Sequence, residues 1–480
     1  MDELSTFYVS EPPLIFSQGY TCSEPQGGLY LHGPYGKYLN GAPNAILADT
    51  GIIGSSNSIT DTRLFFDHIK KRIPTESKGR LDFPGIGLDG KLMFDLQFDE
   101  QWIEEITSAE IEEGKDLEDR EERIHFFLNI IEKKIATLHR KNGPIFVLLP
   151  IPIEILNSCK KPGQIGYHIT ITDRRFSKTP TYIQEKREYD FHNIIKLIGM
   201  KYELPTQLIL PNTLELGKTK FVQDLATRAW NLTVALYYKS RGVPWKIAKL
   251  DPHTCYAGVS FARELSEEGK PLMKASIAHL FLASGECFVL TGESIESTGT
   301  SEPKLTEEQA ENIRNVIISG YEDAHGVKPK RIVIYKKTDF NKNEINGFIK
   351  KDKNIKQVDL ITTKASSINW YRQGEYPPPR GTVIRCPGEY QIFTLGFIQE
   401  METYPNTGIP IPLRTIPYNL DSNEEKMCRE ILSLSKLNWN NINYSELFPA
   451  PISVSNTIGQ ILSEGRARGI QISKLYKYYM

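Results

Sequence analysis

The chain has 480 residues, with 58 basic and 59 acidic side chains and a formal net charge of −1 at pH 7. This balance gives no overall electrostatic signature of a nucleic-acid partner, so any basic surface must come from an uneven distribution of charge. The apolar fraction of 40% is that of an ordinary globular protein. No apolar run approaches the roughly 18 residues of a membrane span, and the acidic N-terminus is not a signal peptide, so we expect no membrane association.

The cysteines are scattered along the chain without CxxC pairs, which favours neither a zinc site nor a disulfide framework. Their spacing instead predicts reduced, buried thiols in a cytoplasmic protein. The six are Cys22, Cys159, Cys255, Cys287, Cys386 and Cys428.

The first half of the chain is expected to form an N-terminal lead followed by an α/β unit. Gly and Pro in residues 1–56 predict tight turns between short strands. Residues 116–141 form a long charged pattern with apolar residues at helical spacing, and 144–153 is a continuous apolar run typical of a buried parallel strand. With a helix from Phe191 and a short strand after it, residues 57–245 predict a Rossmann-like unit.

Two further features of this half concern exposed positions. Residues 158–188 are rich in Lys, Arg and Thr and are expected to form an exposed loop that could face nucleic acid. The basic run Lys70, Lys71 and Arg72 follows a predicted helix and is either its solvated last turn or a backbone-phosphate contact.

Residues 246–480 predict a second α/β unit. A strand at 254–264 is followed by a hairpin at 279–294, and then by a helix at 305–326 with Thr306 as its N-cap. Buried strands at 330–338 and 357–363 flank another helix. This order of elements is that of the ribonuclease-H topology.

A set of polar side chains stands out in the first unit. His192 and Lys196 are four residues apart in an apolar-periodic segment, so both project from one helical face. Gln207 opens a short extended run, and Lys239 lies near the end of a helix expected from about Phe221. An imidazole, two ammonium groups and an amide suit a terminal phosphate. The same spacing is also typical of a solvated helix edge, so spacing alone is weak evidence.

The residues around this set resemble a known family. The run H-x-x-x-K at 192–196, PTQ at 205–207 and N-L-x-x-A-L-Y-Y-K-x-x-G-x-P-W at 231–245 resemble the MID domain of short prokaryotic Argonautes. The resemblance implies that His192, Lys196, Gln207 and Lys239 hold the 5′ phosphate of a guide strand. It also implies that residues 246–480 are a ribonuclease-H-like PIWI domain, and that the terminal carboxylate of Met480 helps to bind Mg²⁺ beside that phosphate. The N and PAZ domains of longer Argonautes are not expected here.

Active PIWI domains need clustered carboxylates to hold two metal ions. By resemblance, the matching positions here are Ser260, Lys337 and Asn456, or a serine beside Asn456. A lysine repels a metal ion and a hydroxyl is a poor Mg²⁺ ligand, so the resemblance implies a PIWI domain without nuclease activity. Asp339 and Glu344 are nearby in sequence but outside the register of the strand.

The resemblance therefore implies a guide-dependent sensor rather than an enzyme. It would bind a 5′-phosphorylated guide RNA and pair it with single-stranded DNA of an invading plasmid or phage. Its expected partner is an APAZ-containing protein with a TIR or sirtuin-like domain that depletes NAD in prokaryotic immunity, in a heterodimer that oligomerises on target binding. The alternatives are an active guide-dependent nuclease whose carboxylates lie elsewhere, and a partner-binding protein with a vestigial guide pocket.

Overall fold

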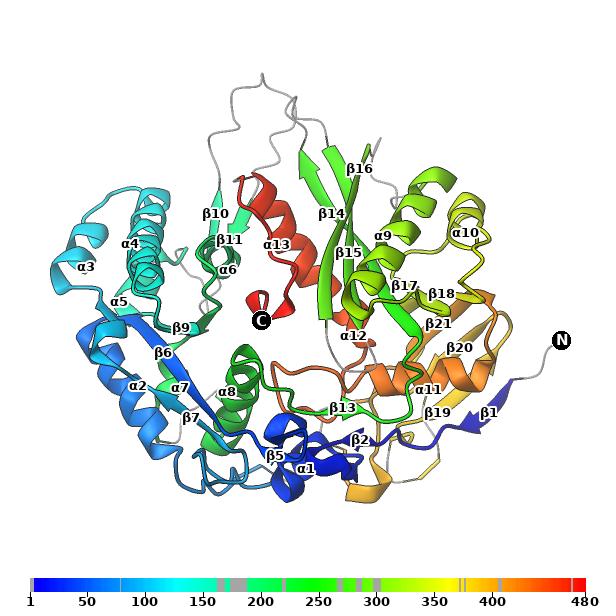
Figure 1. The fold of residues 1–480 in the computed structure, drawn as a ribbon, viewed down its shortest axis with the longest axis horizontal. Helices are drawn as coiled ribbons and strands as arrows, with labels where there is room; N and C mark the ends of the chain where they lie inside the picture. Colours follow the sequence, from blue (N-terminus) through cyan, green and yellow to red (C-terminus); the bar gives the residue numbers. More distant parts are fainter. Residues whose placement is uncertain are drawn as a thin grey trace.

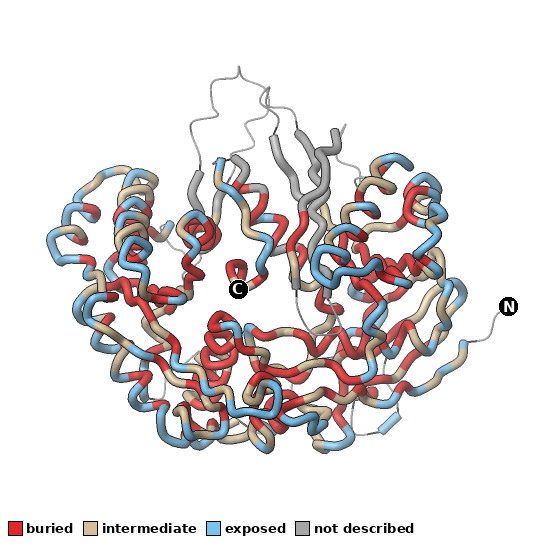
Figure 2. Tube along the Cα trace, in the orientation of Figure 1, coloured by how far each residue is buried: buried red, intermediate tan, exposed pale blue. Residues whose placement is uncertain are grey.

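The computed structural model describes residues 4–77, 79–161, 169–172, 188–217, 222–265, 271–281, 287–296, 304–370, 373–374, 377–404, 408–467 and 469–480. The chain forms two lobes, and its C-terminus lies between them near the centre of the molecule (Figure 1). Buried residues run through both lobes and into this central end of the chain (Figure 2). No helix within the described ranges has both the length and the apolarity needed to cross a bilayer.

The first lobe is built on a five-stranded sheet in the order β12-β9-β6-β7, with β8 also paired to β6. All of these pairings are parallel, as in a Rossmann-like fold. The strands are β6 (Ile46–Gly54), β7 (Phe94–Gln97), β8 (Ile103–Glu105), β9 (Phe146–Pro150) and β12 (Thr206–Ile209). The principal helices are α2 (Ser56–His68), α3 (Ser108–Lys115), α4 (Arg120–Arg140), α5 (Ile153–Cys159), α6 (Phe191–Lys201) and α8 (Leu225–Lys239).

The N-terminal residues belong to the two lobes rather than forming a separate lead. Strand β6 begins at Ile46, inside the range 1–56, and pairs with three strands of the first sheet. Residues 25–32, expected to contain turns, instead form the helix α1 (Pro25–His32). Here the glycines allow close packing, since a Cβ on Gly28 would lie 2.0 Å from the ring of Phe16. The expectation of turns was therefore wrong for residues 25–32, whereas the short strands expected in this part of the chain are present at Ser5–Tyr8, Leu14–Ile15, Thr21–Cys22, Tyr38–Leu39 and Ala42–Pro43.

The second lobe is built on a nine-stranded sheet in the order β1-β19-β20-β21-β18-β17-β14-β15-β16. Strands β14, β17 and β18 are parallel, whereas β14, β15 and β16 form an antiparallel meander, as in ribonuclease H. The strands are β1 (Ser5–Tyr8), β14 (Thr254–Leu265), β15 (Pro271–Phe281), β16 (Cys287–Glu296), β17 (Arg331–Lys336), β18 (Gln357–Ala365), β19 (Thr382–Cys386), β20 (Glu389–Ile392) and β21 (Leu413–Leu420). The principal helices are α9 (Glu307–His325), α10 (Lys342–Phe348), α11 (Glu424–Leu434) and α13 (Ser455–Ala467).

Several predicted elements are confirmed. The run at 144–153 contains the fully buried parallel strand β9, and the charged pattern at 116–141 contains α4. Thr306 is the N-cap of α9, and its side chain forms a capping box with Gln309. Of the segment 158–188, expected to be an exposed loop, residues 162–168 and 173–187 lie outside the described part of the chain.

An ionic network joins the N-terminal residues to the second lobe. The guanidinium of Arg380 donates to Glu11 at 2.9 Å, and Lys436 forms an ion pair with the same carboxylate. The two basic side chains are almost fully buried, and they hold the pKa of Glu11 below its usual value although burial alone would raise it. Removing Glu11 would therefore leave two buried cations without their counter-ion.

The basic run after α2 is solvated and partly neutralised. Arg72 donates to Asp82 at 2.9 Å, and the ammonium group of Lys70 lies 3.4 Å from Asp67. Lys71 is exposed. These contacts favour the solvated alternative over a contact with a nucleic-acid backbone.

Candidate functional site

Lys196 is buried in the first lobe, on the inner face of α6. Asp190 caps this helix, because its side chain accepts a hydrogen bond from the backbone N–H of His192 at 2.8 Å. Lys196 is only 1% exposed, and its Nζ donates to the main-chain oxygen of Thr206 at 2.5 Å. Burial lowers the pKa of Lys196 to about 7. This lysine is therefore not part of a solvated helix edge.

A glycine allows this close contact between α6 and the start of β12. A Cβ on Gly199 would lie 2.6 Å from the main-chain oxygen of Leu204 and 2.9 Å from the Cγ2 of Thr206. The hydrogen at that position lets the helix approach the turn that carries the acceptor of Lys196.

Lys239 occupies the last turn of α8. Its side chain is 1% exposed, and its Nζ donates to the main-chain oxygen of Met480 at 2.9 Å. Burial and the charge of the neighbouring Lys196 lower the pKa of Lys239 well below its usual value. The helix begins at Leu225 rather than near Phe221, and Asp224 caps it.

The two lysines form a buried cationic pair, which we call the paired-lysine site (Lys196 and Lys239). Within the described ranges, both ammonium groups meet main-chain oxygens rather than carboxylate side chains. Two buried like charges whose hydrogen-bond partners are main-chain oxygens are costly, and a bound anion would compensate them.

The other two predicted phosphate ligands lie beside this pair. His192 is half-buried and precedes Lys196 by one helical turn on α6. Gln207 is half-buried on β12 and directly follows Thr206, the partner of Lys196; its Nε2 donates to the main-chain oxygen of Leu208 at 3.1 Å. The structure thus joins Lys196, Lys239 and Met480 through charge and direct contacts, with His192 and Gln207 adjacent in the same elements.

The C-terminal residues pack between the two lobes. Tyr476, Tyr478 and Tyr479 are buried. The hydroxyl of Tyr478 donates to the main-chain oxygen of Glu203 in the first lobe at 3.1 Å. In the second lobe, the backbone N–H of Val289 donates to the main-chain oxygen of Lys474 at 2.8 Å. Met480 is thereby held in place beside Lys239.

The three positions expected to be degenerate gather at one edge of the large sheet. The parallel register pairs Val259 with Lys336, so Ser260 and Lys337 follow at the same end of β14 and β17. The hydroxyl of Ser260 donates at 3.2 Å to the main-chain oxygen of Ser455, the first residue of α13. Asn456 comes next in that helix, and its side chain lies outside the described residues.

The side chains around this edge are basic or already paired. The ammonium group of Lys337 lies 4.5 Å from the ring centroid of Phe448, and burial lowers its pKa. The carboxylate of Glu344 accepts from Lys336 at 2.5 Å in a fully buried ion pair, and Asp339 pairs with Lys364 at 3.1 Å. No group of three or more His, Cys, Asp or Glu that could hold a metal occurs among the residues the structure describes.

Sequence reasoning missed two parts of this arrangement. It did not identify the main-chain oxygen of Thr206 as the partner of Lys196, and it missed the buried pair of Lys336 with Glu344. The sequence signal for the first contact is Gly199, three residues after Lys196. The signal for the second is Glu344, eight residues after Lys336.

Comparisons with known proteins place this geometry in a structural context. No family model and no curated protein match the sequence. The structure is similar to that of Clostridium butyricum Argonaute bound to a guide DNA and a 19-mer target DNA, with a TM-score of 0.65 and 16% identity over 99% of this chain. It is also similar to Drosophila Piwi (TM-score 0.61, 14% identity) and A. aeolicus Argonaute (0.57, 15%), each over 99% of this chain.

The chain spans about 55% of the length of these structures. The parallel sheet of the first lobe and the ribonuclease-H-like sheet of the second both lie within the matched region. The chain therefore has the fold of an Argonaute MID domain followed by a ribonuclease-H-like PIWI domain.

Proposed function

We propose that this protein binds the 5′ phosphate of a guide RNA and uses the guide to recognise single-stranded target DNA, without cleaving that DNA itself. The observation that carries the proposal is the paired-lysine site. A terminal phosphate is a compact dianion near neutral pH and would neutralise both buried ammonium groups. His192 and Gln207, beside the pair, would donate the remaining hydrogen bonds.

The phosphate would favour the proton on Lys196, whose pKa is lowered to about 7 by burial in the nucleic-acid-free protein. A bound anion within hydrogen-bond distance stabilises the charged form of a lysine. The free site thus holds a lysine that is only partly charged near neutral pH, and binding of the phosphate restores the full charge.

Magnesium fits this site only together with the phosphate. Mg²⁺ prefers oxygen ligands and is often bound by one or two carboxylates plus substrate phosphates. Where Met480 ends the chain, its main-chain oxygen beside Lys239 belongs to a terminal carboxylate. We propose that this carboxylate would hold the ion from the protein side, so that the ion screens the negative charges of the guide.

The absence of cleavage is supported by the chemistry at the edge of the large sheet. Ser260 and Lys337 occupy adjacent strand ends, where two-metal catalysis requires carboxylates. Glu344, the buried carboxylate nearest in sequence, is already bound by Lys336 and by the backbone N–H groups of Leu305 and Asn341.

A guide-dependent binder without chemistry of its own needs a partner to produce a response. We propose that this partner is an APAZ-containing protein with a TIR or sirtuin-like domain, and that the two proteins form a heterodimer in the prokaryotic cytoplasm. When the heterodimer binds target DNA, it would oligomerise and the partner would deplete NAD. This part of the proposal rests on the likeness to short prokaryotic Argonautes in the motifs at 192–245.

The phosphate assignment can be tested by measuring the affinity of the full chain for one RNA with either a 5′ phosphate or a 5′ hydroxyl. We expect the phosphate to improve binding at least tenfold, and the variant Lys196→Ala with Lys239→Ala to lose this difference. Lys201→Ala is a matched control, because Lys201 lies on the same helix but is exposed and paired with Glu132 at 2.6 Å. Equal preference in the double variant and the native protein would contradict the assignment.

Cleavage and partner binding need separate measurements. Guide-loaded protein incubated with matched DNA and either Mg²⁺ or Mn²⁺ should leave the DNA intact, and clean cleavage would instead support the active-nuclease alternative. Copurification with an APAZ-containing protein, followed by target-dependent loss of NAD, would support the sensor. If this protein forms a stable complex with a partner protein in the absence of a guide, and adding a guide does not change that complex, the result would favour the partner-binding alternative.

A further inference from the structure

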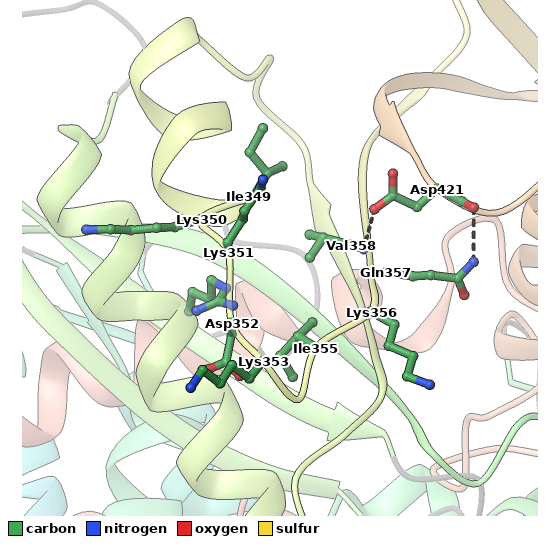
Figure 3. A pocket seen from close by; sticks show the side chains of 11 residues that line it. Ile349, Lys350, Lys351, Asp352, Lys353, Ile355, Lys356, Gln357, Val358 and Asp421 are labelled. Atoms are coloured by element: carbon green, nitrogen blue, oxygen red, sulfur yellow. Dashed lines mark hydrogen bonds between the residues drawn. The ribbon is translucent and has the colours of Figure 1, made fainter.

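A cavity of about 460 Å³ lies in the second lobe, away from the paired-lysine site. Its walls come from α9, from the loop between α10 and β18, from the start of β18, and from Asp421, which follows β21 (Figure 3). Gln357, one of its lining residues, pairs with Arg331 at the beginning of β17, whereas Lys337 follows the other end of that strand. The cavity and the degenerate nuclease positions are therefore at opposite ends of the same parallel strands.

The cavity contains an arginine that lacks hydrogen-bond partners for most of its donors. Arg314 lines the cavity but is only 3% exposed. Its Nε and Nη2 have no hydrogen-bond partner within the described part of the chain, and its Nη1 reaches only the side chain of Asn315 at 3.5 Å. A buried guanidinium with unsatisfied N–H groups is costly unless a ligand completes its hydrogen bonds.

The carboxylates near Arg314 are engaged elsewhere. Asp352 accepts from the backbone N–H of Asn354 at 2.8 Å, and Glu311 is bound by Lys350 at 2.5 Å. Both lie close enough to favour the charge on Arg314, but neither is hydrogen-bonded to Nε or Nη2. On the opposite wall, Asp421 accepts from the backbone N–H of Val358 at 2.8 Å, as Figure 3 shows.

Further basic side chains surround the opening. Lys351, Lys353 and Lys356 are exposed residues of the cavity wall. Counting Arg314 and Lys350, which is paired with Glu311, the lining has five basic residues and two acidic residues, Asp352 and Asp421. An excess of basic side chains around an opening attracts an anion and raises its local concentration.

We propose that this cavity binds the phosphate group of a small phosphorylated molecule, with Arg314 as the recessed contact and the lysines as the rim. Phosphate suits the geometry, because a guanidinium presents planar paired donors that match phosphate oxygens. A small molecule suits the volume, which lies within the range of ligand pockets, about 300–1,000 Å³. The recessed position of Arg314 favours a terminal phosphate over the backbone of a passing strand.

The proposal can be tested by calorimetric titration of the full chain with pyrophosphate. The background variant Lys196→Met with Lys239→Met removes binding at the paired-lysine site, so that only the cavity is measured. In this background, Arg314→Met should weaken pyrophosphate binding at least tenfold. Its melting temperature should stay equal or rise, since the substitution removes a buried cation with unsatisfied donors. Lys342→Glu, an exposed lysine of α10 outside the cavity lining, is the control and should bind as before.

Two outcomes would overturn the proposal. One is unchanged pyrophosphate affinity in Arg314→Met. The other is binding only of a DNA strand with no terminal phosphate, which would assign the cavity to a nucleic-acid backbone. If Arg314→Met does not fold, the double variant Lys353→Glu with Lys356→Glu replaces it, because this variant changes only exposed side chains. Weaker pyrophosphate binding by the double variant supports the proposal, and unchanged binding overturns it.

Discussion

The Nζ of Lys239 donates a 2.9 Å hydrogen bond to the main-chain oxygen of Met480, 241 residues further along the chain. The bond connects the last turn of a helix in the MID lobe to the last residue of the sequence. Because Lys239 is buried at this junction, the proposed binding of a 5′ phosphate and the docking of the C-terminal segment are expected to depend on each other.

The first prediction concerns the stability of the nucleic-acid-free protein. The pKa of Lys196 is about 7 in the folded state, against an ordinary value of 10.5. Between these values the unfolded chain binds more protons, so the free energy of unfolding should rise with pH, by up to about 1.4 kcal/mol per pH unit. Urea denaturation from pH 6.5 to 9 measures the slope. Lys196→Met should reduce this slope, whereas Lys201→Met should leave it unchanged.

The second prediction concerns the pH dependence of guide binding. In the proposed phosphate site, Lys196 must take up a proton above pH 7 before it can bind the dianion. The affinity for 5′-phosphorylated RNA should therefore fall as the pH rises from 7 to 8.5, by up to about tenfold per unit. The affinity for the 5′-hydroxyl RNA should stay nearly constant. A parallel decline for both RNAs would place the titrating group outside the phosphate site.

The third prediction concerns the buried ion pair of Lys336 with Glu344. Glu344→Gln leaves a buried ammonium group without its counter-ion and should cost about 3–5 kcal/mol of unfolding free energy. Replacing both residues with Met should cost less than this single change. Glu425→Gln is the matched control, because Glu425 pairs with Arg429 in a solvent-exposed ion pair, whose loss should cost at most about 1 kcal/mol. Chemical denaturation of all four proteins gives the comparison.

The fourth prediction concerns Gly199. Alanine favours a helix over glycine by about 1 kcal/mol, but here its Cβ would lie 2.6 Å from the main-chain oxygen of Leu204. We expect the clash to dominate and Gly199→Ala to lose about 1–3 kcal/mol of stability, together with part of the preference for a 5′ phosphate. Gly217→Ala should be tolerated, since its Cβ meets no atom within 4 Å. Equal stability of the two variants would show that α6 can shift away without cost.

The sequence predicted the helices and strands that are determined by the pattern of residues within their own segment. The apolar run in β9 and the helical spacing in α4 are visible in a short window of sequence, because a buried parallel strand and an amphipathic helix each impose their own periodicity. The helix α1 was not predicted, because Gly27 and Gly28 normally indicate turns. Only the ring of Phe16, which packs against Gly28, explains the glycine at that position.

The sites depend on contacts between distant segments, which a sequence pattern shows less well. Spacing alone could not distinguish Lys196 from a solvated lysine, because its burial comes from β12 and from Gly199. Arg314 reads as an ordinary polar position of an amphipathic helix. Its burial depends on the loop at 349–357, which lies against α9 around the cavity.

The position of β1 has a consequence for the synthesis of this protein. Ser5 pairs with Arg385, so the partner strand of β1 is made only after most of the chain has left the ribosome. Until then, β1 has an open hydrogen-bonding edge and Glu11 is separated from its buried partners. Contacts between such distant residues slow folding, so we expect the pairing of β1 with β19 to be a late step in forming this sheet. A nascent chain halted before residue 385 would therefore still have a free N-terminal strand.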